Sequence, residues 1–232
     1  IGALAYLPSI ANTTAAGASV EANVALTTYL AANGNGIPFY YNIAAGDWAA
    51  ATAGGGAAGV TTDDTRRIDH TVYSLANNPV VAARQATLIY CNGVGTGGKV
   101  WYYPSDRDGT TYTYFPLTTT APYPNLTNFM AESVCTAAER VIFLGTSENG
   151  VSYPQRVRWT SQSWTDLTSA TAVWNNIVDG GAGGLDLVEF AGKGLRILPQ
   201  GDRVVTYFSD GVAVLEPTGR TVRCCSTRSS FT

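Results

Sequence analysis

The chain of 232 residues carries a net charge of −3, and only 13% of its residues are charged although 45% are hydrophobic. The length fits one large all-β domain or two small ones. No basic run or stripe is present, which excludes sequence-specific nucleic-acid binding because that binding needs Lys and Arg clustered against phosphates. No apolar run reaches the roughly 20 residues of a membrane span, so we expect no such span.

The scarcity of charge predicts a protein that works in an assembly. Charged residues make up about 25% of an ordinary soluble domain, and here Gly, Ala, Ser, Thr and Asn take their place. Such a neutral surface suits a subunit whose sides are covered by neighbours. The opening IGALAYLPS lacks the features of a secretory signal, and Cys91, Cys135, Cys224 and Cys225 form no CxxC pair. We therefore expect assembly in a cytoplasm, with reduced thiols, no zinc and no other cofactor.

Residues 1–62 are predicted to be an Ala/Gly-rich N-terminal extension of strands, an arm and a flexible loop. Apolar and polar residues alternate over 19–30, which favours a strand, although a short helix also fits. After a turn at NGNG, the aromatic and β-branched stretch IPFYYNI (37–43) predicts a second strand. The glycine-rich residues 51–62 predict the flexible loop.

Residues 63–232 are predicted to be a domain of repeated β-hairpins, each an apolar strand, a turn and a second strand. The three pairs are 86–91 with 99–105, 140–145 with 156–161, and 203–208 with 212–217. Further strands are expected at 111–117, in GLDLVEF and in GLRILP. The second strands start 57 and 56 residues apart, which indicates an internal repeat. With the N-terminal strands, this predicts an all-β, propeller-like array of about four blades, and a two-sheet β-sandwich is the alternative.

Two charged groups in the first half are candidate sites. Asp63, Asp64, Arg66 and Arg67 form a compact charged cluster. It is either an inter-subunit salt bridge or metal contact, or a solvated helix start, and exposed charge runs favour the solvated position. The only histidine, His70, follows Asp69, but no nucleophile motif accompanies them, and adjacent residues of a strand point to opposite faces. We expect an ordinary strand or loop histidine and a protein that is not an enzyme.

In the stretch SYPQRVRWTSQSW, Arg156 and Arg158 alternate with Val157 and Trp159. This pattern predicts a half-buried strand with one cationic face, entered through the rigid pair at 153–154.

The order of motifs over residues 138–217 resembles that of β-propeller proteins of phage tails, including the tail tubular or nozzle proteins of short-tailed phages. The motifs are RVIFLG, RVRWTSQSW, GLDL and LPQGDRVVTYFSDG, and the resemblance extends loosely over 71–137. It implies a structural virion protein of a tail or head-to-tail connection, assembled in the host cytoplasm. Its partners would be copies of itself in a ring and other tail or connector proteins. A neutral or acidic lumen would then let DNA slide without binding.

On this resemblance, Val157 and Trp159 pack between blades, Trp164 covers the following turn, and Trp101 belongs to the core. Arg156 and Arg158 would face a neighbouring subunit or the lumen, and a merely solvated position is equally expected.

Two other functions remain open. The 13 Tyr and 5 Trp could supply sugar-stacking platforms in a carbohydrate-binding or glycan-cleaving host-recognition propeller, although most alternate with polar residues like core positions. The Ala/Gly/Thr-rich start is also compatible with a cellular surface-filament subunit.

Overall fold

The computed structural model describes the backbone of residues 3–7, 27–31, 38–42, 47–50, 52–53, 69–74, 86–95, 98, 100–104, 113–116, 126, 128–162, 174, 181–218 and 221–227. It describes the side chains of residues 69–73, 89–95, 98, 100–101, 126, 128–162, 174 and 181–216. In this part of the chain no helix is long and apolar enough to cross a bilayer.

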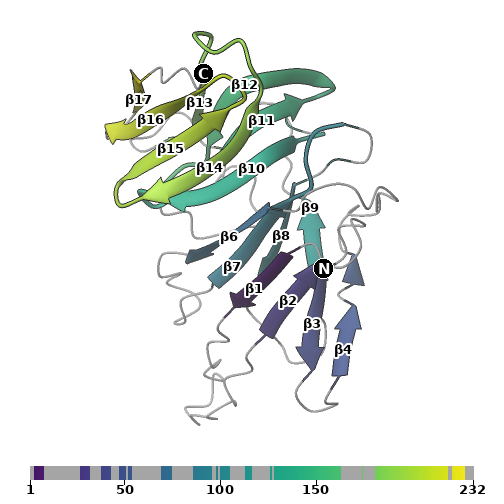
Figure 1. Ribbon diagram of the computed structural model, residues 1–232. Helices are drawn as coiled ribbons and strands as arrows, with labels where there is room; N and C mark the ends of the chain where they lie inside the picture. The colour runs from purple at the N-terminus through teal and green to yellow at the C-terminus, as the bar shows by residue number, and fades with distance from the viewer. Residues whose placement is uncertain are drawn as a thin grey trace.

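The described residues form an all-β protein of four sheets (Figure 1). The first sheet has the order β1–β2–β3–β4, with strands Ala3–Leu7, Thr27–Ala31, Pro38–Asn42 and Asp47–Ala50. The second has the order β5–β9–β8–β7–β6, with strands Thr52–Ala53, Thr113–Pro116, Val100–Pro104, Ala86–Cys91 and Asp69–Ser74. The third has the order β10–β11–β12–β13, with strands Met130–Ala137, Arg140–Glu148, Val151–Trp159 and Gly183–Asp186. The fourth has the order β14–β15–β16–β17, with strands Gly194–Gln200, Arg203–Phe208, Gly211–Thr218 and Thr221–Thr227.

The sheets repeat one plan, in which consecutive strands pair antiparallel with their neighbours along the chain. The hairpins expected from the sequence are present as β7–β8, β11–β12 and β15–β16, one each in the second, third and fourth sheets. Strand β5 departs from the plan, since it pairs parallel with β9 and so adds residues 52–53 to the second sheet. The remainder of the expected loop, 54–62, lies outside the described residues.

The entry to β12 differs from the sequence-based expectation. The strand starts at Val151, directly after the two-residue turn Asn149-Gly150, whose φ values of 53° and 84° match the Asn-Gly turns that favour hairpins. Pro154 therefore lies inside the strand, and the predicted entry at 153–154 is wrong. The register shifts between Leu144 and Thr146, opposite Pro154, and such an irregularity tolerates a residue that cannot donate to the ladder.

The third sheet contributes to two separate cores, because it lies between two other sheets. One core cluster joins it to the second sheet: Tyr73, Ile89, Cys91, Val100, Leu126, Phe129, Ala131, Val134, Val141, Phe143, Trp174 and Ala182. The other joins it to the fourth sheet: Cys135, Ala137, Ile142, Leu144, Val157, Trp159, Leu187, Phe190, Ile197, Val204, Phe208, Ala213 and Leu215. Strand β11 is buried along its whole length. The stack has more layers than a two-sheet sandwich, and the sheets follow one another from β1–β4 in the lower part of Figure 1 to β14–β17 in the upper part.

Candidate functional site: the contacts between sheets

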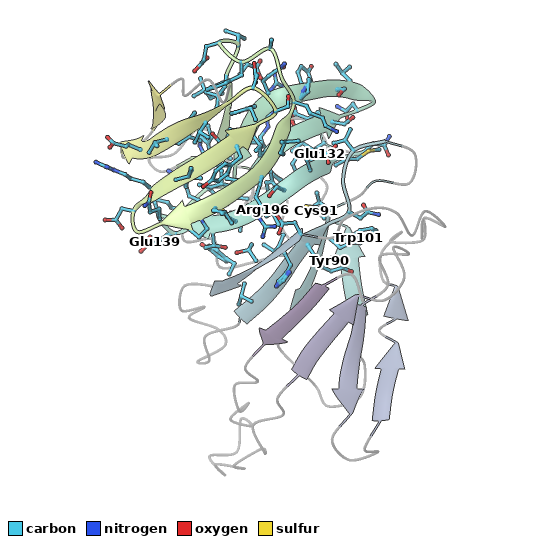
Figure 2. All side chains as sticks on the ribbon, in the orientation of Figure 1. Tyr90, Cys91, Trp101, Glu132, Glu139 and Arg196 are labelled. Atoms are coloured by element: carbon cyan, nitrogen blue, oxygen red, sulfur yellow. The ribbon has the colours of Figure 1, made fainter. Side chains whose placement is uncertain are left out.

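Edge strands of three successive sheets, β6, β10 and β14, meet at one buried carboxylate, that of Asp69 on β6. Its Oδ2 accepts hydrogen bonds from the Ser133 hydroxyl and, at 3.3 Å, from the Val134 amide, both on β10. The Ser133 hydroxyl oxygen in turn accepts the Ile197 amide of β14 at 3.0 Å. Arg196 approaches Asp69 Oδ1 to 3.7 Å, and Figure 2 labels Arg196 in the region where β10 and β14 meet the second sheet. One carboxylate and one hydroxyl therefore connect three sheets.

The link between β6 and β10 continues along both strands. Thr71 and Thr136 share a hydrogen bond of 2.9 Å between their hydroxyls, and the Tyr73 hydroxyl donates to the Glu139 carbonyl at 3.0 Å. Asp69, Thr71 and Tyr73 are alternate residues, so they lie on one side of β6. That side of β6 therefore contacts β10 and the turn that follows it.

The same geometry shows what this junction does chemically. The Ser133 side chain is fully buried and both donates and accepts, so its hydroxyl is committed to structure. His70 lies in β6, its backbone amide donates to Asp69 Oδ1 at 3.1 Å, and burial lowers its pKa. Burial also raises the pKa of Cys135 to about 12, which removes the thiolate at neutral pH. Within the described part of the chain, no three His, Cys, Asp or Glu residues gather as metal ligands.

A second polar cluster lies on the third sheet and contains both arginines of the alternating stretch. Arg156 binds Asp186 through two hydrogen bonds, from Nε at 2.6 Å and from Nη2 at 2.8 Å, and the two residues are register partners. Arg156 Nη1 also donates to Glu148 at 3.2 Å, and Arg158 donates to the same carboxylate, from Nε at 3.0 Å and from Nη2. The Tyr153 ring lies under the Arg156 guanidinium, 3.5 Å from its carbon. The hydrogen bond from Arg156 lowers the pKa of Asp186.

This cluster is formally neutral, with two guanidinium groups facing two carboxylates. Both arginine side chains are largely buried, so within the chain they are paired rather than merely solvated. Their expected place at a subunit interface or lumen stays a prediction. Val157 and Trp159, on the other face of β12, are buried in the core cluster against the fourth sheet.

The remaining sequence-derived residues divide into two groups. Trp101 on β8 is buried and stacks on Tyr90 with ring centroids 5.1 Å apart (labelled in Figure 2). Trp164, Asp63, Asp64, Arg66 and Arg67 lie outside the described residues.

Sequence reasoning missed most of the groups that join the sheets. Asp69 was considered only beside His70, and the alternation of Asp69, Thr71 and Tyr73 was the available signal. Asp186 stands in GLDL, but nothing in the sequence indicates its register with Arg156. Ser133 carries no local signal, because both its partners are 64 residues away.

The face of the fourth sheet opposite its core with the third sheet mixes apolar and charged residues. Alternate residues of β14, β15 and β16 form it: Arg196, Leu198, Gln200, Arg203, Val205, Tyr207, Val212, Val214 and Glu216.

No protein-family model matches the chain, and no curated protein matches it.

Proposed function

We propose that this chain is a structural virion protein, a propeller-like subunit of a phage tail or head-to-tail connection, which forms a ring around the DNA path. The observation that carries the proposal is the face-to-face stack of three sheets whose edge strands, β6, β10 and β14, are hydrogen-bonded together through Asp69 and Ser133. In a propeller, four-stranded sheets pack face to face around a central axis in this manner. The motif order over residues 138–217 points the same way.

The work of such a subunit is mechanical. The buried side chains of Asp69 and Ser133 bind strands of neighbouring sheets, which keeps the blades in fixed positions. The arginine cluster is neutralised within the chain, and the net charge is −3. A lumen lined by such subunits would not attract phosphate strongly, so DNA would pass through it.

The glycan-binding alternative has less support from the aromatic residues. A sugar platform needs exposed rings, whereas the three tryptophans whose side chains the structure describes, Trp101, Trp159 and Trp174, are buried. No described feature favours a surface filament over a virion subunit.

Electron microscopy of intact virions tests the proposal. Virions whose protein content includes this chain by mass spectrometry would be labelled with gold-conjugated antibody raised against the purified chain, then imaged without label for symmetry. We expect label on the tail or connector and a closed ring with an axial channel at that position. Antibody preadsorbed with the purified chain is the control.

Two results would overturn the proposal. Label confined to fibre tips, together with binding of the purified chain to host-surface glycans, would establish host recognition instead. Label on cell-surface filaments and none on virions would establish the filament alternative.

A further inference from the structure

The turn between β11 and β12 combines a reactive pair of residues with an open surface position. Asn149 and Gly150 are both exposed, and nothing lies within 4 Å of a Cβ placed on Gly150. The two residues connect the strands directly, because Glu148 and Val151 on either side of them are register partners. Glycine carries no side chain that hinders reaction at its own backbone nitrogen. The Gly150 nitrogen therefore needs only a local opening at the end of one hairpin to reach the Asn149 side chain.

A second Asn-Gly pair, which follows β7, has closed surroundings. Asn92 is fully buried, and a Cβ placed on Gly93 would lie 3.3 Å from Oε2 of Glu132 on β10 (labelled in Figure 2). The same carboxylate accepts the Val94 amide at 3.4 Å. This pair is thus held against the third sheet, and the chain contains one exposed and one buried copy of the same dipeptide for comparison.

We propose that Asn149 is a deamidation site of the folded chain, whereas Asn92 is protected. A base removes the proton of the Gly150 amide, and the amide nitrogen attacks Cγ of Asn149. The new C–N bond closes a succinimide ring, and the side-chain nitrogen takes up a proton and leaves as ammonia. Water then opens the ring at either carbonyl, which gives aspartate or isoaspartate. Ammonia is exchanged for water overall, and solvent supplies both the water and the base.

The isoaspartate product would alter the strand pairing beside the turn. Isoaspartate continues the chain through its side-chain carbonyl, which adds one methylene to the backbone between the register partners Glu148 and Val151. Glu148 is also the carboxylate that pairs with both Arg156 and Arg158. Formation of isoaspartate should therefore loosen the end of the hairpin that positions this carboxylate, whereas the aspartate product keeps the length of the backbone.

Peptide mapping of the purified full chain measures the two sites separately. Trypsin releases Asn92 in the peptide of residues 85–99 and Asn149 in that of residues 141–156, and neither peptide contains another asparagine. The folded chain is incubated at mildly alkaline pH, and mass spectrometry then follows the conversion of each asparagine to acid. We expect Asn149 to react at least about tenfold faster than Asn92, because local opening is easiest at an exposed hairpin end. In urea the two rates should become similar, since glycine follows both residues, and a sample digested without incubation gives the background.

Amide hydrogen exchange tests the effect on the hairpin. The modified chain is separated by its added negative charge, and methyl transfer by an isoaspartate-specific carboxyl methyltransferase identifies the isoaspartate form. Exchange over residues 148–151 should be faster in this form than in Asn149→Asp, which carries the same charge on an unaltered backbone. Equal exchange in the two would overturn the effect on the hairpin.

Two results of the peptide mapping would overturn the assignment of the site. One is an Asn149 that stays unconverted in the folded chain for a time that converts it in urea. The other is an equal rate of conversion at Asn92 and Asn149 in the folded chain, which would show that the contacts of the buried pair give no protection.

Discussion

Asp69 and Glu148 are buried carboxylates that each accept hydrogen bonds from a neighbouring strand. A buried charge is tolerated only where donors satisfy it, and it is strongly destabilising once one partner is removed. Asp69 connects sheets, whereas Glu148 connects strands of one sheet. At the scale of single residues, both buried carboxylates therefore hold neighbouring strands together through hydrogen bonds.

Replacement of Asp69, which connects two sheets, should lower the free energy of unfolding substantially. Asp69→Asn keeps the shape but removes the charge, and its amide group would meet the donors of Ser133 and Val134. We expect a loss of about 2–3 kcal/mol in the free energy of unfolding, measured by urea denaturation. Asp202→Asn, at an exposed turn position, is the control and should change stability by less than about 0.5 kcal/mol. Equal effects of the two substitutions would contradict the role of Asp69.

The pairing of Asp186 with Arg156 should appear in the pH dependence of stability. The pKa of Asp186 is lower in the folded chain than its ordinary value of 3.8. Its contribution to stability is thus fully present above pH 3.8 and is lost as the pH falls through the folded-state pKa. Because the carboxylate is 43% exposed, the effect should stay below about 1 kcal/mol.

The measurement compares urea unfolding of the unaltered chain and Asp186→Asn at pH 7 and at several values below 3.8. The difference in unfolding free energy between them should shrink as the pH falls. A difference that stays constant with pH would mean that the ion pair contributes nothing, and Asp202→Asn again serves as the control.

At the scale of the strand, the sequence predicts what is local and misses what depends on distant partners. Period-two alternation with Asn-Gly or Asp-Gly turns correctly predicted the middle hairpins β11–β12 and β15–β16. Strand β10, MAESVCTA, was not predicted, because Glu132, Ser133 and Thr136 make it look polar. Ser133 and Thr136 are satisfied by residues of other sheets, which no local pattern can reveal.

The turn between β10 and β11 is the clearest local weakness among the hairpins. Ala138 and Glu139 adopt φ values of 47° and 58°, which disfavour side chains other than Gly, Asn and Asp. Ala138→Asn should therefore raise the free energy of unfolding by about 0.5–1 kcal/mol in urea denaturation.

At the turn Asn149-Gly150, we expect a substitution that disfavours a positive φ to destabilise the chain. Nothing lies within 4 Å of a Cβ placed on Gly150, so Gly150→Ala changes only the backbone preference at a φ of 84°. We expect it to destabilise the chain by about 1 kcal/mol. If Ala138→Asn had no effect while Gly150→Ala did, the first turn would be relaxed rather than strained.

At the scale of the whole molecule, the shared cores should make neighbouring sheets unfold together. Leu144 lies in the core between the third and fourth sheets, and a Cβ on Gly194 would lie 2.6 Å from its Cγ. Leu144→Ala should cost about 2–4 kcal/mol and accelerate amide hydrogen exchange in β11, β14 and β15 alike. Val151→Ala, at a position 52% exposed, should accelerate none of them. Faster exchange confined to β11 would show that the sheets open independently.

The all-β class was predictable because strand patterns recur along most of the chain, and it is confirmed. The order of the layers was not predictable from the sequence, because β11 is buried on both faces and so lacks the alternation of apolar and polar residues that indicates which side meets a neighbouring sheet. The repeat derived from the hairpins was 56–57 residues, whereas the junction partners Asp69, Ser133 and Ile197 are each 64 residues apart.

That 64-residue spacing has a consequence for synthesis on the ribosome. Each sheet is made of consecutive strands, so it can form as its own segment emerges, but Asp69 must wait for Ser133 and Ser133 for Ile197. At translation rates of about 5–20 residues per second, each wait lasts roughly 3–13 s. During that time a finished sheet exposes the face that its successor will cover, which makes the nascent chain vulnerable to pairing with the wrong sheet.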